Sequence, residues 1–93
     1  MVISILRVVL FIGCANSLKT KRMILKSLKV RLRNKFNIAV SEIDQHDKWQ
    51  KAVLGIVGID NDRRNLDEQF GKIINYIEFF SQVDIVNYER QML

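Results

Sequence analysis

Residues 2–12 have the sequence VISILRVVLFI, and the alternation within this stretch predicts the kind of sheet that the chain can build. The stretch is rich in β-branched residues, which favour strands. Four alternate positions on one face of this strand are all apolar and should face the core: Leu6, Val8, Leu10 and Ile12. The other face carries four apolar residues around one arginine: Ile3, Ile5, Arg7, Val9 and Phe11. A strand that is apolar on both faces lies centrally in a covered sheet or beneath an oligomer contact.

A helix is expected to follow this strand. Ser17 stands where the side chain of an N-cap residue accepts hydrogen bonds from free backbone N–H groups, and the helix should run from about Leu18 to Lys35. Its apolar residues recur at helical spacing in a single stripe, with Ile24 at its edge: Leu18, Leu25, Leu28 and Leu32.

A second helix is expected after Asn61 and Asp62, which offer N-cap chemistry. Its apolar residues step by four, three, four and three positions along one stripe: Leu66, Phe70, Ile73, Ile77 and Phe80. A glycine inside a helix costs roughly 1 kcal/mol relative to alanine, so Gly71 indicates close packing against a neighbouring element.

Three further strands complete the pattern. Residues 38–43 and 49–59 are predicted to form an antiparallel hairpin, and residues 83–89 supply the last strand. The order β-α-β-β-α-β with right-handed crossovers predicts an α+β ferredoxin-like plait, in which both helices cover one face of a four-stranded antiparallel sheet. The 93 residues are expected to form a single domain.

The uncovered face of this sheet is a candidate interface. With the first strand central and no helix over this side, four apolar side chains would face solvent together with part of the third strand: Ile3, Ile5, Val9 and Phe11. Solitary soluble domains usually avoid such a patch. We therefore expect self-association, as in a dimer, or a partner that covers this face.

The charge of the chain is segregated along the sequence. The formal net charge is +5, but residues 1–46 hold nine basic and two acidic residues, whereas residues 47–93 hold six basic and eight acidic residues. Eight basic residues and no acidic residue fall between Leu18 and Phe36. At about 100° per residue, five of these cations share one narrow band beside the leucine stripe: Lys19, Arg22, Lys26, Lys29 and Arg33.

Two interpretations of this band remain open. Like charges at helical neighbour positions repel by a few tenths of a kcal/mol per pair, and an ordinary solvated helix mixes both signs. A polyanion is therefore a natural partner. The alternative is a solvated face that only keeps a small protein soluble. No motif that reads bases is visible, so contact with the nucleic-acid backbone alone would be non-specific.

No residues suggest catalysis, a metal or a cofactor. His46 has no second histidine or cysteine near it in sequence, whereas a metal site needs three or four converging ligands. Cys14 has no histidine base at a defined spacing, so a small hydrolase would lack a nucleophile and base pair. Arg7 and Asn16 invite comparison with acylphosphatases, which share the plait, but the glycine-rich phosphate loop of those enzymes is absent. Trp49 is interpreted first as an anchor at the edge of the core, with a binding aromatic as the alternative.

Cysteine content and hydropathy suggest a cytoplasmic protein with no membrane partner. A single cysteine cannot form an internal disulfide, so nothing marks an oxidising compartment. The apolar run of residues 2–12 is too short to span a bilayer, and it lacks the basic region that begins a secretory signal. Residues 11–14 are similar to the end of a lipoprotein signal, but Arg7 interrupts the apolar region that such a signal requires.

Several stretches together make the chain resemble the YlxP-like family, a group of small bacterial proteins classed as a domain of unknown function. The resemblance covers nearly the whole chain and rests on these segments: Leu6-Arg7-Val8, Ser17-Leu18-Lys19 with Lys21-Arg22, residues 32–38 (LRNKFNI) running to Glu42, residues 47–52 (DKWQKA) with Leu54-Gly55, and Asn61-Asp62. The resemblance implies a ferredoxin-like plait and no accepted catalytic residues.

The same resemblance implies a role near the ribosome or its RNA, with ribosomal RNA or a ribosomal subunit as partner, because members of the family are often encoded beside genes of translation initiation and ribosome maturation. The chain departs from the family where a Pro-Gly turn and a histidine commonly precede the Ser-Leu-Lys motif, since it has Gly13-Cys14 and Asn16 there. Val9 and Phe11 replace positions that are often charged in relatives, which favours a covered sheet face. We expect a non-enzymatic RNA- or ribosome-associated accessory factor, with a homo-oligomeric interaction module as the alternative.

Overall fold

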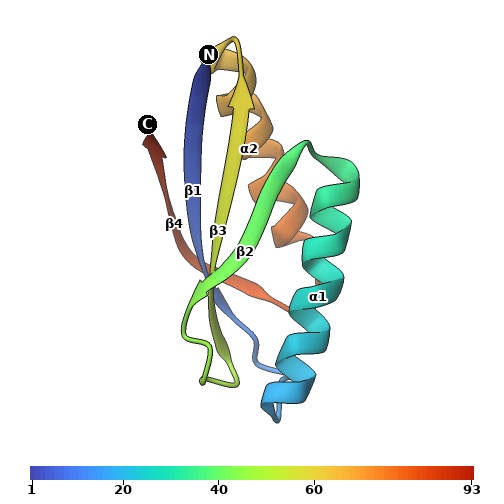
Figure 1. Ribbon diagram of the computed structural model, residues 1–93. Helices are drawn as coiled ribbons and strands as arrows, with labels where there is room; N and C mark the ends of the chain where they lie inside the picture. Colours follow the sequence, from blue (N-terminus) through green and yellow to red (C-terminus); the bar gives the residue numbers. More distant parts are fainter.

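The computed structural model describes all 93 residues and shows the predicted order of elements (Figure 1). The elements are β1 (Val2–Phe11), α1 (Leu18–Lys35), β2 (Ile38–Asp44), β3 (Lys51–Asp60), α2 (Arg63–Glu78) and β4 (Asp84–Met92). The bounds of α1 agree with those predicted. Neither helix is both long and apolar enough to cross a membrane.

The four strands form one antiparallel sheet in the order β2-β3-β1-β4. The two central strands pair over their full length, from Val2 opposite Asp60 to Phe11 opposite Lys51. Both helices lie against the same face of the sheet, and the other face carries no helix (Figure 1). The protein is therefore a ferredoxin-like α+β plait, as the sequence predicts.

The core lies between the sheet and the two helices. The inward face of β1 is fully buried, which confirms the predicted alternation: Leu6, Val8, Leu10 and Ile12 are each 0% exposed. Four members of the predicted α2 stripe, Leu66, Phe70, Ile73 and Ile77, are also buried, and Phe80 packs against the core just after the helix ends. The core consequently fixes which face of each helix remains outside.

Two strand boundaries differ by more than one residue from those predicted. β3 begins at Lys51 rather than Trp49 because Gln45 adopts a left-handed backbone conformation (φ 62°) and its carbonyl accepts the N–H of Lys48, which makes a turn. β4 continues to Met92 rather than Glu89 because β1 offers backbone partners as far as Ser4, opposite Met92. The first difference comes from a local turn, whereas the second comes from pairing between distant segments, which local patterns do not encode.

The expectation of close packing at Gly71 is wrong. A Cβ atom at Gly71 would meet only Arg90 Nη2, at 4.0 Å. The glycine that close packing requires is Gly58 on β3, where a Cβ atom would lie 2.9 Å from Leu66 Cδ2 and 3.3 Å from Phe70 Cε1. α2 therefore approaches the sheet most closely over Gly58.

Candidate nucleic-acid interface

Local interactions at both ends hold α1 in place. The Ser17 hydroxyl accepts the N–H of Thr20 at 3.1 Å, which confirms the predicted N-cap, and the Phe36 N–H donates to Leu32 O at 2.8 Å. The inward face of the helix is buried against the sheet, and this burial sets its rotation about its own axis: Ile24, Leu25, Leu28 and Leu32. The predicted band of cations is consequently turned away from the core.

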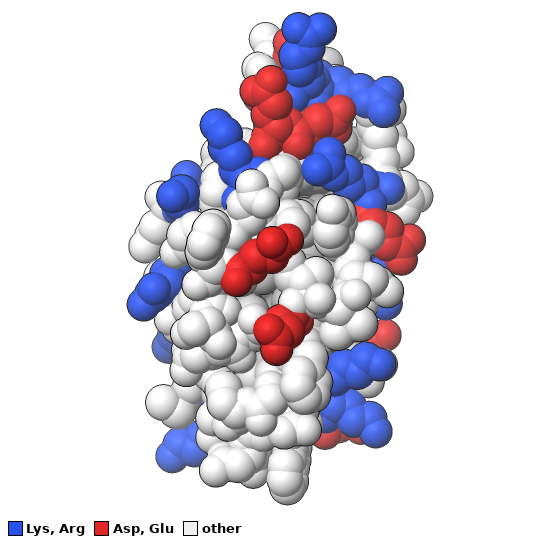
Figure 2. Space-filling view, turned by 180° about the vertical axis from the view of Figure 1, so that it is seen from behind, with Lys and Arg blue, Asp and Glu red and all other residues white.

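We call Lys19, Arg22, Lys26, Lys29 and Arg33 the basic band. Four of its side chains are exposed and Lys29 is half-buried. The band extends about 20 Å along the helix axis, given a rise of about 1.5 Å per residue. None of its members forms an ion pair, because the four ion pairs of the structure involve other cations. Figure 2 shows Lys and Arg, and no Asp or Glu, along the edge of the molecule formed by α1.

The other three cations of α1 interact within the fold. The Arg31 guanidinium lies 5.6 Å from the centre of the Phe80 ring, and Lys35 Nζ lies 5.2 Å from the centre of the Tyr76 ring. These two contacts turn one flank of α1 towards α2 and its C-terminal end. The basic band occupies the opposite flank, on the side of the edge strand β2. The helix thus separates three cations that contact partners within the fold from five that form no ion pair.

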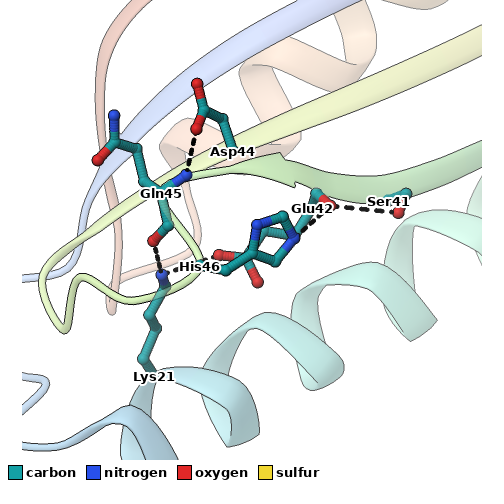
Figure 3. Close-up of polar contacts among 6 residues, drawn as sticks. All are labelled: Lys21, Ser41, Glu42, Asp44, Gln45 and His46. Atoms are coloured by element: carbon teal, nitrogen blue, oxygen red, sulfur yellow. Dashed lines mark hydrogen bonds and ion pairs between the residues drawn. The ribbon is translucent and has the colours of Figure 1, made fainter.

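Lys21 is the third of these cations and is 1% exposed (Figure 3). Its ammonium group lies 2.8 Å from Glu42 Oε2 on β2, and it donates to Gln45 O at 2.7 Å. Sequence reasoning counted Lys21 among the eight basic residues of the helix but assigned it to no face. The available signal was its position four residues before Leu25 and seven before Leu28, which places it within the leucine stripe rather than beside it.

The β2–β3 loop is bound to the segment that precedes α1. Gln50 Nε2 donates to Gly13 O at 3.1 Å and to Ala15 O at 3.3 Å, and the Gln50 carbonyl accepts the N–H of Ile12 at 2.8 Å. Lys21 adds the contact with Gln45 on the other side of the loop. The start of α1 and the β2–β3 loop therefore form one continuous end of the molecule, at the bottom of Figure 1.

The uncovered sheet face contains all four residues predicted there, with unequal exposure. Phe11 is 44% exposed and Ile3 and Ile5 are half-buried, but Val9 is only 7% exposed. Val9 pairs directly with Val53 of β3, and each covers the other within the sheet. Two residues of β3, the strand expected to contribute to this face, add to its exposed apolar area, and so does one residue of β2 that was not expected there: Val57, Ile59 and Ile43.

The remaining residues of interest lie apart from one another. His46 is exposed, with its ring Nε2 3.1 Å from Glu42 O, and no group of three or more His, Cys, Asp or Glu side chains converges as a metal site would need. Arg7 pairs with Glu89 at 3.7 Å, and Asn16 accepts a hydrogen bond from the Thr20 hydroxyl. The interpretation of Trp49 as a core anchor is wrong, because its side chain is 55% exposed in the β2–β3 loop.

Comparison with known proteins identifies the family. A model for proteins of unknown function, DUF503, matches residues 3–90. The chain belongs to the DUF503 family. The "Uncharacterized protein YlxP" of Bacillus subtilis (strain 168) is 34% identical to it over 70 residues, which is 75% of this chain and 76% of that protein. These matches confirm the resemblance to YlxP-like proteins.

Proposed function

We propose that this DUF503 protein is a non-enzymatic, cytoplasmic accessory factor that associates with RNA or the ribosome through the basic band of α1. One observation carries the proposal. The fold engages Lys21, Arg31 and Lys35 of the same helix, yet it leaves all five cations of the band without an anionic partner. A phosphate backbone supplies the missing anions.

The energetics of the helix support a polyanion as partner. Successive members of the band are three or four residues apart, so each neighbouring pair repels by a few tenths of a kcal/mol in the free protein. Attraction to phosphates placed along the band would offset this repulsion, and the release of the counterions condensed on the RNA would drive binding. Lysine and arginine side chains that contact only the backbone fix position without reading sequence.

The test is a salt titration of binding to ribosomal subunits and to free ribosomal RNA. If five phosphates of duplex-like RNA are contacted, log K should fall with log salt concentration with a slope of roughly 4. The triple variant Lys26→Glu, Lys29→Glu, Arg33→Glu should lose most of the affinity and flatten the slope. A matched control makes the same charge change on the other helix, with Arg63→Glu, Arg64→Glu and Lys72→Glu, and should bind almost as the unaltered protein does.

Two results would contradict this proposal. The first is an affinity that does not change with salt, since counterion release would then contribute nothing. The second is an equal loss of affinity in the α1 and α2 triple variants, because this would indicate a response to net charge rather than to the band.

The uncovered sheet face supports a second candidate function, self-association as a protein-interaction module. Ile43 and Ile59 are 50% and 51% exposed on this face, and Phe11 and Val57 are 44% and 39% exposed. Burying such side chains against a second sheet is favourable by about 25 cal/mol per Å² of apolar surface. In this alternative the basic band confers only solubility.

A further inference from the structure

A hollow of about 650 Å³ lies at the end of the sheet formed by the β2–β3 loop. Two aromatic side chains line it, Trp49 from the loop and Phe11 from the end of β1, and both are substantially exposed. Lys48 and Lys51 line it as well, with Asp47 as the single acidic residue. The hollow therefore combines aromatic surfaces with an excess of positive charge.

We propose that this hollow binds a base of single-stranded RNA, stacked on Trp49 or Phe11, with Lys48 and Lys51 at the adjacent phosphates. The inference rests on the proposed function and names the form of RNA that it involves. Aromatic side chains beside a basic path are the features by which proteins bind single strands without sequence preference, because every base has a face that can stack.

The placement of the hollow connects it to the basic band. Gln50 binds the loop to the carbonyls of Gly13 and Ala15 just before α1, and Lys21 binds the first turns of α1 to Gln45. The first two members of the band, Lys19 and Arg22, are thus held at the same end of the molecule as Trp49 (Figure 1). An RNA backbone bound along the band therefore ends near the hollow, where Lys48 and Lys51 supply further positive charge beside Asp47.

The exposure of Trp49 favours an RNA base as the occupant of the hollow, rather than another side chain of the same protein. Trp49 is 55% exposed at the hollow although neighbouring apolar side chains are available for packing. The loop that carries it is bound at both ends by the contacts of Gln45 and Gln50, so the indole is presented rather than buried. A duplex keeps its bases stacked internally and therefore cannot use this surface.

Trp49 is the only tryptophan of the chain, so its fluorescence reports on the hollow directly. The experiment compares a single-stranded oligouridine about ten nucleotides long with an RNA duplex of the same length, at one low salt concentration. We expect the single strand to quench Trp49 and the duplex to bind through the band with little quenching. Trp49→Ala should lower the affinity for the single strand about tenfold and leave that for the duplex unchanged.

Two variants serve as controls. Trp49→Phe keeps an aromatic surface and should retain most of the single-strand affinity. Phe79→Ala removes a 90% exposed aromatic side chain at the end of α2, away from the hollow, and should change neither affinity. The triple variant Lys26→Glu, Lys29→Glu, Arg33→Glu should lower the affinity for both the single strand and the duplex, because both RNAs contact the basic band.

The single-strand and duplex titrations distinguish the proposal for the hollow from the proposal for the basic band. One outcome is duplex binding with a steep salt dependence, but no quenching by the single strand and no effect of Trp49→Ala. It would overturn the proposal for the hollow and leave the proposal for the basic band standing. Absence of binding to either RNA at low salt would overturn both. Quenching that rises with protein concentration alone would assign the hollow to a second copy of the chain and so contradict a base as its occupant.

Discussion

At the residue scale, Lys21 joins the two regions that the functional proposals use. Its buried ammonium group neutralises Glu42 of β2, and it also satisfies the carbonyl of Gln45 in the loop. Gln45 has a positive φ, which costs a non-glycine residue of order 1 kcal/mol or more. The contact with Lys21 offsets part of this cost, so one side chain holds both the loop geometry and the position of α1.

Replacing Lys21 with methionine should lower the free energy of unfolding by about 3 kcal/mol, because the change leaves the Glu42 carboxylate buried without a cation. Urea denaturation measures the change. The double variant Lys21→Met, Glu42→Leu should recover much of the loss, since a buried ion pair can be exchanged for apolar contacts at little cost. A single-variant loss below about 1 kcal/mol would mean that Lys21 is hydrated and not a structural contact.

The two glycines near α2 should respond in opposite directions to the same substitution. Gly71→Ala should raise the free energy of unfolding by about 0.5–1 kcal/mol, because alanine favours the helix and meets no close atom there. Gly58→Ala should lower it by about 1–3 kcal/mol, because its Cβ atom would press on Leu66 and Phe70. Thermal unfolding of the two variants tests the pair, and equal shifts would refute this account of the packing.

At the element scale, α1 is the part of the molecule that its own sequence predicts best. Its N-cap, its leucine stripe and the angular position of the basic band depend only on residues within the helix, so they could be inferred before any tertiary contact was known. The burial of Lys21 and the exposure of Trp49 depend on how β2 and the loop after it pack against α1. The contribution of Ile43, Val57 and Ile59 to the open face depends on strand register, which local sequence does not determine.

Reversing one charge in the middle of the band should stabilise the helix and weaken RNA binding together. Lys26→Glu replaces repulsion from Arg22 and Lys29 with attraction, which should raise the free energy of unfolding by roughly 0.5 kcal/mol. The control Lys72→Glu removes an attraction to Glu68 on α2 and should slightly lower stability without affecting RNA affinity. Denaturation and RNA titration of both variants are the measurements. Tighter RNA binding by the Lys26→Glu protein would contradict the role given to the band.

At the scale of the whole molecule, the sheet separates two chemically different sides. The helical side carries the cations of α1, and the open side carries most of the exposed apolar residues of the strands (Figure 1). Each side supports one of the two candidate functions. The functions are compatible, because a dimer joined through its open faces would present two basic bands outwards.

Charged substitutions on the open face should abolish self-association and leave RNA binding by the band intact. Val57→Lys with Ile59→Lys alters two exposed positions, which avoids the buried Val9 and so keeps the monomer folded. Light scattering should show the unaltered protein as an oligomer and the variant as a monomer. Phe79→Lys, which changes an exposed apolar residue away from the sheet, is the control and should remain oligomeric. An unaltered chain that is already monomeric would rule out this alternative.

The unpaired cations of α1 also have a kinetic consequence. With the positive charge gathered along one edge, the molecule is an electric dipole, and the field of an approaching polyanion turns that edge towards it before contact. Collisions in the wrong orientation become rarer, so the association rate constant should exceed that of an uncharged surface and fall steeply as salt shortens the range of the field. The lifetime of the complex, once formed, should depend more on the short-range contacts at its surface than on this long-range steering.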